Sequence, residues 1–430
     1  MRLLARFATA NARLKRRIWR PPGAPAHAIG FSYRLCSQSA DVLKQAKRSY
    51  LDYNATAPLR PEARRACVAA LDSIGNPSSV HGEGRDARAL VEEARAAVAE
   101  LAGVSPRAVT FTASGTEAAN LALTPAIAGK GRTPLTRLIA SAGEHSCVLK
   151  GHRFASSAVG LAPLRDDGRI DLESLEESVQ RSGGPIMLAL QGANNETGII
   201  QPVAKAAALV HAAGGIVVCD AVQLAGRAPC AAAALGADFL ILSAHKIGGP
   251  KGAGALIAAS PDVSVAEPLI RGGGQERGLR AGTENVAAIA GFGAAARAAM
   301  AELASEPARL AKLREGLAAH IARTAPDAVI FGADVDRLPN TLYFAVPGIG
   351  AETLVIALDL AGIAVSSGAA CSSGKVARSH VLDAMRVDPA LSAGAIRLSL
   401  GWSSDQGDVA HFGEAFAAVA SRLRRGRHAA

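Results

Sequence analysis

The sequence of 430 residues predicts an α/β protein, with a large domain built on a mainly parallel sheet and a smaller α+β domain. Three observations support this prediction. Apolar strand-like segments alternate with helical segments along most of the chain, the strands lack the polar alternation of a sheet with one exposed face, and the pattern changes towards the C-terminal end. A chain of this length holds two or three domains of roughly 100–200 residues each.

The predicted elements of the large domain begin after Asn54. Helical periodicity covers residues 61–71 and 84–101. Strands and helices then alternate, with strands at 109–112, 137–141, 187–190, 215–219 and 239–242, and helices at 118–122 and 203–213. Ligands of such sheets bind beyond the carboxyl ends of the strands, so the polar residues that follow the strands are the candidates for a functional site.

The pattern of the smaller domain follows. A long helical stretch runs from Asn285 to about residue 325, and residues 340–346 alternate like a strand with one exposed face. A helix at 351–360, strands at 363–365 and 395–400 and a helix at 409–424 complete the chain. We therefore expect three parts: a basic leader at 1–48, a large domain at 61–303, and a small domain made of 49–60 and 304–430.

The basic charge of the chain is concentrated in the leader. Of 47 Lys and Arg and 37 Asp and Glu, 11 basic residues but only one acid lie in residues 1–48, which leaves 36 of each sign in the rest. A neutral body gives no field that would steer nucleic acid to it. The leader has the composition of an organellar transit peptide, which predicts the organellar matrix; a disordered tail from an upstream start site is the preferred alternative and predicts the cytoplasm.

Neither a membrane span nor a metal site is predicted. No apolar run approaches the roughly 20 residues that a span needs. The six cysteines form no C-x-x-C pair, and no spacing of Cys and His is typical of zinc. So few cysteines in so long a chain favour a reducing compartment over a disulfide scaffold.

Two apolar strands are followed by residues suited to catalysis or cofactor binding. Lys246 follows the strand at 239–242 in a loop of small residues, where desolvation makes an amine nucleophilic toward carbonyls; the alternative is a solvated loop lysine. Asp220 ends the strand at 215–219, where a buried carboxylate needs a cation. A protonated pyridine nitrogen is such a cation and points to pyridoxal phosphate, whereas capping of the next helix is the alternative.

Other strand ends carry weaker signals. The Ser-Gly-Thr segment at 114–116 stands between a strand and a helix, which suits a phosphate and is also compatible with a capping box. His145 is placed to lie over a planar cofactor, although a lone histidine is more often structural. Asn195 offers an amide, and Arg397 is suited to bind a carboxylate through two hydrogen bonds. The glycine-rich segment 271–283 contains three arginines, which suit an anion or an interface.

Cys371 stands alone in a run of small polar residues, Ser366 to Gly374. Such a loop is typically exposed and mobile, whereas a structural cysteine is usually buried among apolar side chains. An exposed free thiol on a mobile loop suits nucleophilic chemistry.

Together these motifs resemble the cysteine desulfurases of the NifS/IscS-like group, within the class V aminotransferase family of pyridoxal-phosphate enzymes. The resemblance covers residues 50–424 approximately and rests on the order and spacing of Ser-Gly-Thr-Glu, Glu-His, Asn-Asn-Glu-x-Gly, Asp-Ala-x-Gln, Ser-x-His-Lys, Arg-Gly-Gly-Gly and the serine-rich cysteine loop. It implies a large domain similar to the fold type I pyridoxal-phosphate transferases. The cysteine loop is similar to that of the long-loop subgroup.

The resemblance implies a role for each candidate residue. Lys246 would form a Schiff base with the cofactor, and Cys371 would attack the substrate sulfur. His145 would stack on the ring of the cofactor, Asp220 would pair with the ring nitrogen, and Gln223 would contact the ring hydroxyl. The phosphate would be held by Gly115, Thr116, Ser243 and His245, with Thr283 from the partner subunit of a homodimer. The substrate carboxylate would be bound by Asn195 and Arg397.

The implied activity is the removal of sulfur from L-cysteine. L-alanine would be released, and the sulfur would remain on Cys371 as a persulfide until it passes to an acceptor such as an iron–sulfur scaffold. A selenocysteine lyase or an aminotransferase for a small amino acid is the alternative within the family, and an aminotransferase would not need Cys371. A non-catalytic binding protein on the same fold is an alternative from another class, against which the complete set of Lys, Asp, His and Cys argues.

Overall fold

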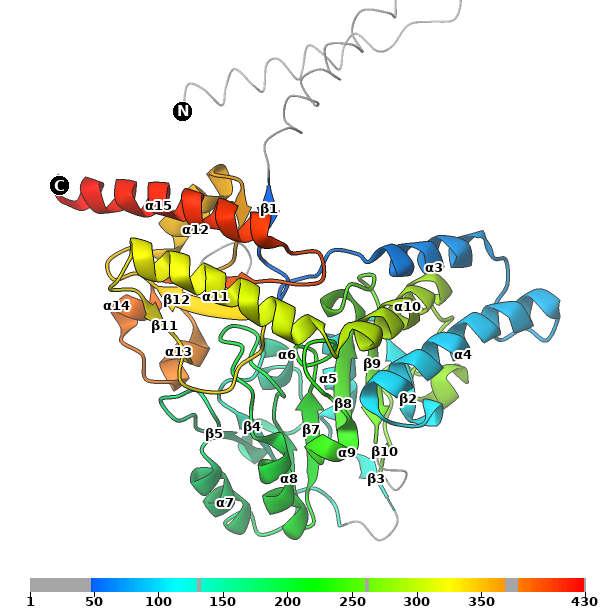
Figure 1. Cartoon of the computed structure of the whole chain (residues 1–430). Coiled ribbons are helices and arrows are strands. Elements are labelled where there is room, and N and C mark those ends of the chain that lie inside the picture. The colour runs from blue at the N-terminus through cyan, green and yellow to red at the C-terminus, as the bar shows by residue number, and fades with distance from the viewer. Residues whose placement is uncertain (1–47, 130–132, 260–262, 368–377, 429–430) are drawn as a thin grey trace, which may run out of the picture. The chain divides into compact units, whose positions relative to one another are not determined.

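A computed structural model of the chain describes residues 48–129, 133–259, 263–367 and 378–428 (Figure 1). Residues Arg48–Ala430 form one compact unit. The predicted basic leader, apart from Arg48, lies outside the described residues, and so does Cys371.

A seven-stranded sheet forms the centre of this unit, in the order β2-β9-β8-β7-β6-β4-β5. Strands β8, β7, β6, β4 and β5 are parallel to one another, and β9 is antiparallel to both of its neighbours. The sheet is therefore mainly parallel, as the sequence predicts. Its strands are β2 (Val109–Thr112), β4 (Arg137–Ser141), β5 (Val159–Ala162), β6 (Ile186–Ala189), β7 (Ile216–Asp220), β8 (Phe239–Ser243) and β9 (Gly254–Ala258).

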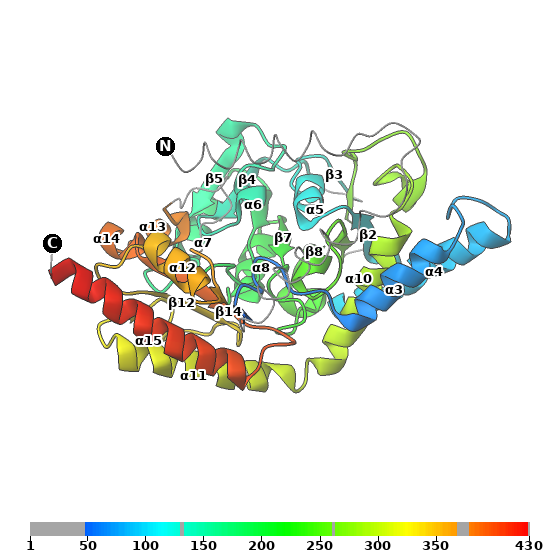
Figure 2. The same ribbon diagram turned by 90° about the horizontal axis from the view of Figure 1, so that it is seen from above.

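The central strands are buried on both faces. Neighbouring residues of β6 show this: Leu188 packs into a cluster with residues of α4, α8 and α10, whereas Met187 packs into a second cluster with residues of α5. Figure 2 shows α5 and α10 on opposite sides of the sheet. Double burial explains why the strands read as apolar runs without polar alternation. The helices and short strands around this sheet are α3 (Pro61–Asp72), α4 (Gly82–Ala102), α5 (Gly115–Ala122), α6 (Ser146–Leu149), α7 (Leu172–Gln180), α8 (Val203–Ala212), α9 (Ala232–Leu235), β3 (Ile127–Ala128) and β10 (Ser264–Val265).

The long helical stretch predicted after Asn285 is two helices, α10 (Val286–Glu302) and α11 (Glu306–Thr324), which meet at 80°. Pro307 lies in the first turn of α11, where its missing amide hydrogen suits a helix start and prevents α10 from continuing. Helix α10 packs against α3 and α4, and α11 packs against α15 (Gln406–His428). Within the described ranges no single helix is long and apolar enough to cross a membrane, although α10 and α11 pass that test as a bent pair.

A three-stranded antiparallel sheet, in the order β11-β12-β14, follows these helices. The prediction of one exposed face for residues 340–346 is wrong, because all five residues of β12 are buried. Leu342 and Phe344 pack under α11, α12 and α15, while Tyr343 and Ala345 pack on the opposite face with residues of α13. The elements of this region are β11 (Val329–Ile330), β12 (Thr341–Ala345), α12 (Ala351–Leu360), β13 (Ile363–Ala364), α13 (His380–Ala384), α14 (Pro389–Ser392) and β14 (Ala395–Ser399).

The first described segment joins the C-terminal elements. Strand β1 (Ser49–Tyr50) pairs in parallel with β13, and Asp52 bridges to Ser399 at the end of β14. Leu51 is fully buried among the residues under α12 and α15. The segment after β1 is thereby held next to the carboxyl ends of the large sheet. The division into domains at residues 61 and 303 stays a prediction.

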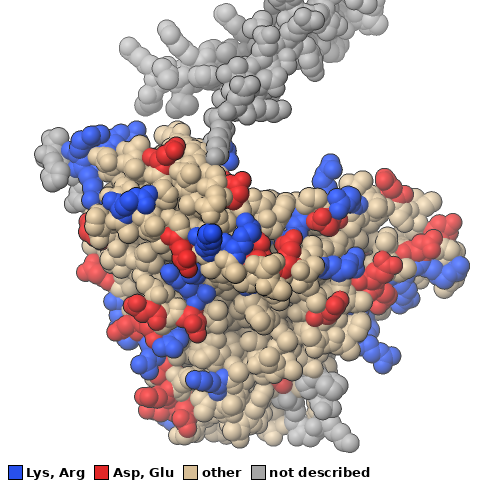
Figure 3. All heavy atoms as spheres, viewed as in Figure 1, with Lys and Arg blue, Asp and Glu red and all other residues tan. Residues whose placement is uncertain are grey.

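The surface carries charges of both signs. On the face in Figure 3, basic and acidic side chains are interspersed. Some of them form exposed ion pairs, such as Arg181 with Glu177 at 3.2 Å. Exposed pairs of this kind contribute at most about 1 kcal/mol, so they do little to define the fold.

Candidate active site

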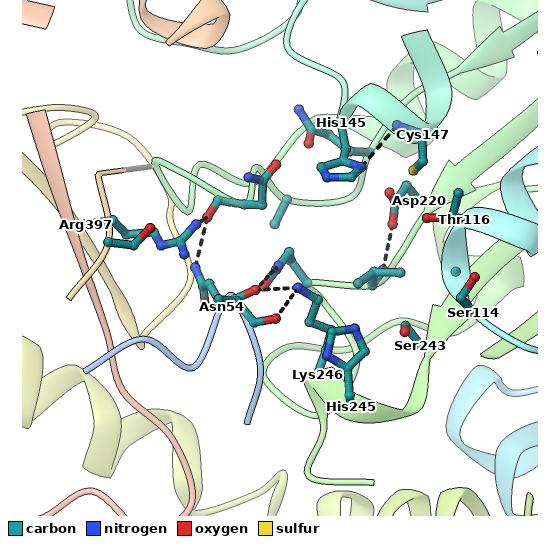
Figure 4. Close-up of a pocket in the computed structure, with 18 residues that line it drawn as sticks. Asn54, Ser114, Thr116, His145, Cys147, Asp220, Ser243, His245, Lys246 and Arg397 are labelled. Atoms are coloured by element: carbon teal, nitrogen blue, oxygen red, sulfur yellow. Dashed lines mark hydrogen bonds between the residues drawn. The ribbon is translucent and has the colours of Figure 1, made fainter. Parts of the chain in front are cut away.

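A pocket of about 320 Å³ lies at the carboxyl ends of β6, β7 and β8 (Figure 4). Its lining includes ten of the residues that the sequence singled out: Gly115, Thr116, His145, Asn195, Asp220, Gln223, Ser243, His245, Lys246 and Arg397. Thr283 does not line it, and Cys371 lies outside the described residues. The sequence prediction that the polar strand ends converge is confirmed, whereas the role of each residue remains to be tested.

Lys246 reaches the pocket from a short 3-10 turn, Ala244–Lys246, that directly follows β8. Its Nζ donates hydrogen bonds to the main-chain oxygens of Asn54, at 2.6 Å, and Ala55, at 2.8 Å. The amine is therefore positioned by the segment after β1, a segment almost 200 residues away in the sequence. The alternative of a freely solvated loop lysine does not fit this arrangement.

Asp220 ends β7 with its carboxyl group in the pocket. Its Oδ1 accepts a hydrogen bond from the Val222 amide at 3.0 Å, so the side chain also stabilises the turn after the strand. Burial raises the pKa of this carboxyl group above its ordinary value, while the Val222 amide, His145 and Lys246 act in the opposite direction. A cation bound in the pocket would stabilise the ionised form, as the sequence argument requires.

His145 precedes α6 and faces the pocket (Figure 4). Its Nδ1 accepts a hydrogen bond from the Cys147 amide at 3.2 Å, so it caps the helix and lines the site at once. Burial lowers the pKa of this imidazole, and the charge of Asp220 only partly offsets that effect. A neutral ring is compatible with stacking on a planar cofactor.

A cradle for an anion lies at the start of α5. Ser114 caps this helix by accepting a hydrogen bond from the Glu117 amide at 3.1 Å, and Glu117 in turn accepts one from the Ala113 amide at 2.9 Å. A side chain on Gly115 would bring its Cβ to 3.2 Å from Val222 and 3.4 Å from Ser243, so glycine lets the helix start approach the Ser243 side chain. Both the capping box and the anion site of the sequence analysis are compatible with this geometry.

Arg397 enters from β14 and is held in place by two partners. Its Nη1 donates to the main-chain oxygen of Asn195 at 2.7 Å, and its Nη2 forms an ion pair with Asp52 at 2.7 Å. Within the part of the chain that the structure describes, its Nε is buried without a hydrogen-bond partner. A buried donor without a partner is costly, so this atom is suited to receive an oxygen of a bound carboxylate.

The two neighbouring asparagines of the Asn-Asn-Glu motif have different surroundings. Asn195 lines the pocket, whereas Asn194 is buried and its Oδ1 accepts hydrogen bonds from Glu196 and Thr197. Asn194 therefore shapes the turn, and only Asn195 is available to a ligand.

Several residues of the pocket were missed by the sequence analysis: Asn54, Cys147, Gln191 and Ser366. Asn54 is the most important of them, because its main-chain oxygen accepts from Lys246 and from the Gln223 amide. No strand of the large sheet precedes it, so the rule that ligands bind at strand ends gives no signal for it. Cys147, two residues after His145, brings a thiol into the pocket.

The donor set fits pyridoxal phosphate. One end of the pocket combines the start of α5 with the hydroxyl groups of Ser114, Thr116 and Ser243, which suits a phosphate. The pocket also contains an amine, Lys246, and a buried carboxylate, Asp220, which suit an aldehyde and a ring cation.

The sequence matches relatives along nearly all of this region. Residues 49–412 match the aminotransferase class-V family. A cysteine desulfurase of Cereibacter sphaeroides is 42% identical over 386 residues, which cover 88% of this chain and 97% of that protein. An IscS-like cysteine desulfurase of Mycobacterium tuberculosis is 37% identical over 389 residues, which cover 89% of this chain and 98% of that protein.

Solved structures agree with these matches. The NifS-like protein from Rickettsia africae has a TM-score of 0.78 at 34% identity, covering 87% of this chain and 99% of its own. SspA, solved in complex with cysteine, has a TM-score of 0.70 at 28% identity, covering 82% of this chain and 98% of its own. From the family match, the relatives and the fold, the chain belongs to the class-V aminotransferase family.

Proposed function

We propose that the chain is a cysteine desulfurase that uses pyridoxal phosphate to remove the sulfur of L-cysteine, with release of L-alanine. The single observation that carries this proposal is the convergence of Lys246, Asp220 and His145 on one pocket, in a fold shared with cysteine desulfurases. Each of these residues comes from a different strand end, so their meeting is a property of the folded chain.

The residues of the pocket support the following arrangement of the cofactor. Lys246 would hold it covalently, and Asp220 would pair with its ring nitrogen. The ring would lie against His145, its hydroxyl group near Gln223, and its phosphate at the start of α5, with Gly115, Thr116, Ser243 and His245. When bound, the cofactor supplies a carbonyl group for amines and an electron sink for a carbanion beside it.

The chain supplies the remaining chemistry. Arg397 and Asn195 bind the carboxylate of the substrate, and the pairing of Arg397 with Asp52 fixes the direction of its guanidinium group. The Lys246 amine, once displaced by the substrate amine, moves a proton at the substrate α-carbon. Its hydrogen bonds to the oxygens of Asn54 and Ala55 define where that amine rests.

Cys371 receives the sulfur. Its thiolate attacks the sulfur of the substrate, so that an S–S bond forms on Cys371 while the Cβ–S bond breaks. The electron pair of the broken bond and a proton stay with the carbon skeleton, which leaves as L-alanine. The reaction therefore leaves a persulfide on the enzyme, and an acceptor such as an iron–sulfur scaffold takes the sulfur from it.

The proposal includes a homodimer. Thr283 is the last residue of the glycine-rich segment 271–283, shortly before α10, and is exposed in one subunit. In the dimer it would bind the cofactor phosphate in the pocket of the partner. The sequence leader leaves the location open between the cytoplasm and the organellar matrix, and mass spectrometry of the native protein distinguishes a retained leader from a cleaved one.

The decisive experiment uses the purified full chain with pyridoxal phosphate and L-cysteine. We expect equal amounts of alanine and reducible sulfur. Cys371→Ser should lose sulfur release by more than about a thousandfold and keep the visible absorbance of the bound cofactor, because the thiol acts after cofactor binding. Cys67→Ser, on α3 and far from the pocket, is the matched control and should keep full activity.

Two results would contradict the proposal. Sulfur release by Cys371→Ser at the rate of the unchanged chain would show that the thiol is not the acceptor. Transfer of the amino group to a keto acid, without release of sulfur, would instead identify an aminotransferase.

A further inference from the structure

Arg227 lies behind the pocket, in the turn that follows β7, and only 6% of its surface is exposed. Its Nη1 donates to Oε1 of Gln223 at 2.6 Å and to the main-chain oxygen of Gln223 at 3.0 Å. Its Nη2 donates to the main-chain oxygens of Lys246, at 3.1 Å, and Tyr53, at 3.4 Å. Two of the residues that it holds, Gln223 and Lys246, line the pocket.

All the partners of this guanidinium group are neutral. Among the described residues no carboxylate forms an ion pair with it, and burial followed by the charge of Arg397 lowers its pKa to about 10. At neutral pH it is still a cation. A buried charge without a counter-ion costs several kcal/mol, so this site is a poor choice for stability alone.

The chemistry of the guanidinium group decides how Gln223 is oriented. Arginine has only donors, so the Gln223 amide must turn its oxygen toward Arg227. Its NH₂ group then points the other way, where it donates to the main-chain oxygen of Asn54 at 3.1 Å. An amide nitrogen has two hydrogens, so one N–H remains for a ligand in the pocket that Gln223 lines.

The same cation also fixes the position of Lys246. Arg227 donates to the main-chain oxygen of Lys246 itself and to that of Tyr53, the residue before Asn54. It therefore holds the main chain on both sides of the contact between Lys246 and Asn54. The Asn54 oxygen in turn accepts from the Lys246 amine and from the Gln223 amide. Arg227 thereby joins the three segments that determine where the amine and the amide lie.

From this geometry we infer that Arg227 is a positioning residue, which turns the N–H of Gln223 toward the ring oxygen of the cofactor and holds the Lys246 turn beneath it. The inference rests on the proposed function, because it needs the cofactor in this pocket. An N–H donor stabilises the ring oxygen as an anion, and a reversed amide would present a carbonyl oxygen instead and destabilise it.

The test is a double-mutant cycle read from the absorbance of the bound cofactor. The visible band of the cofactor–lysine linkage changes when the linkage loses its proton, and a donor to the ring oxygen lowers the pH of that change. We expect Gln223→Leu to raise the midpoint by about one pH unit in the otherwise unchanged chain. In the Arg227→Met background the same change should move the midpoint by less than about a third of that, because the amide is no longer oriented.

Equal shifts in both backgrounds would overturn the inference, since Arg227 would then act only through its charge. Arg60→Met is the matched control: Arg60 is also 6% exposed and donates to the main-chain oxygen of Ile247, but it does not contact Gln223. It should lower stability and leave the midpoint unchanged. If Arg227→Met does not fold, Arg227→Lys, which keeps the charge but not the forked geometry, replaces it, and a full Gln223→Leu shift in that background would refute the coupling to the fork.

The outcomes separate this inference from the proposed function. If the unchanged chain neither takes up pyridoxal phosphate nor releases sulfur from cysteine, the proposed function fails. If it does both and the shifts are additive, only the role of Arg227 fails.

Discussion

Two buried arginines have different partners: Arg95 lies at the edge of the large sheet, and Arg227 lies behind the pocket. Arg95, on α4, meets Glu276 through two hydrogen bonds of 2.7 and 2.8 Å, and both side chains are almost completely buried. Burial alone would lower the pKa of Arg95, but Glu276 and Glu92 raise it above the ordinary value. Arg227 is buried to nearly the same degree, all its partners among the described residues are neutral, and its pKa falls to about 10.

The difference shows which buried charges stabilise the fold and which do not. At the edge of the sheet Arg95 has an opposite charge beside it, and Glu276 also accepts the Phe111 amide at 2.8 Å, so the pair fastens the loop before α10 to β2. Around the pocket, burial raises the pKa of Asp220 and lowers those of His145 and Arg227, because compensation there is incomplete. Perturbed groups of this kind are typical of sites that bind or transform a ligand.

The largest effect should come from Lys246→Ala. If this lysine were a structural residue, the contrast between the edge of the sheet and the pocket would not hold. We expect activity to fall by more than about a thousandfold, because the nucleophilic amine is removed. The free energy of unfolding of the cofactor-free protein should fall by no more than about 3 kcal/mol, since the amine donates to two main-chain oxygens in partly exposed hydrogen bonds. Sulfide release and urea unfolding measure the two quantities, and a loss of stability without a loss of activity would reverse the assignment.

Arg95→Met should affect stability instead. The variant leaves the Glu276 carboxylate buried without its cation, so the free energy of unfolding should fall by about 3–5 kcal/mol. Arg169→Met, which breaks the more exposed pair with Asp167, is the control and should cost at most about 1 kcal/mol. If the two variants unfold at the same urea concentration, the buried pair is not the structural element that the comparison requires.

Asp220→Asn sharpens the comparison, because it should move stability and activity in opposite directions. The amide removes the cost of a buried carboxylate, so the cofactor-free protein should become about 1–2 kcal/mol more stable. Activity should fall at least about a hundredfold, because the ring nitrogen of the cofactor loses its counter-ion. A cofactor-free variant that is less stable than the unchanged protein would mean that the turn after β7, and not the ligand, requires the carboxylate.

The smallest effect should be the acid dependence that His245 confers. Burial, and then the charges of Lys246, Lys251 and Arg227, lower the pKa of its imidazole from 6.5 to about 4. Between these two pH values the unfolded chain binds a proton that the folded chain does not, so stability rises with pH and is lost as the pH falls from 6.5 to 4. His245→Asn should therefore reduce the loss of unfolding free energy over this interval by about 2 kcal/mol.

The idea is wrong if His245→Asn and the unchanged protein lose stability in parallel between these pH values.

Much of the site could be predicted from the sequence for a local reason. A buried parallel strand must be apolar along its length, so the polar residues that follow it stand out; Asp220, Lys246 and His145 were found in this way. The same rule gave no signal for Asn54, whose main-chain oxygen holds both the amine and the Gln223 amide. Its role depends on β1 pairing with β13, a contact between residues more than 300 positions apart.

The failures of the sequence analysis have the same cause. The alternation in β12 predicted an exposed face, but α13, which comes later in the chain, covers it. The helical stretch after Asn285 was predicted to be continuous, because periodicity does not record that α10 and α11 pack on different parts of the protein.

The sequence by itself determined the mainly parallel sheet, the family and the chemical identity of the pocket, because strand periodicity and strand-end residues are local properties. Only the tertiary structure decided which charges have partners. Whether a buried arginine meets a carboxylate, as Arg95 does, or a neutral amide, as Arg227 does, depends on which distant segments the fold brings beside it. This difference in partners distinguishes the buried charges that stabilise the fold from those that position residues of the pocket.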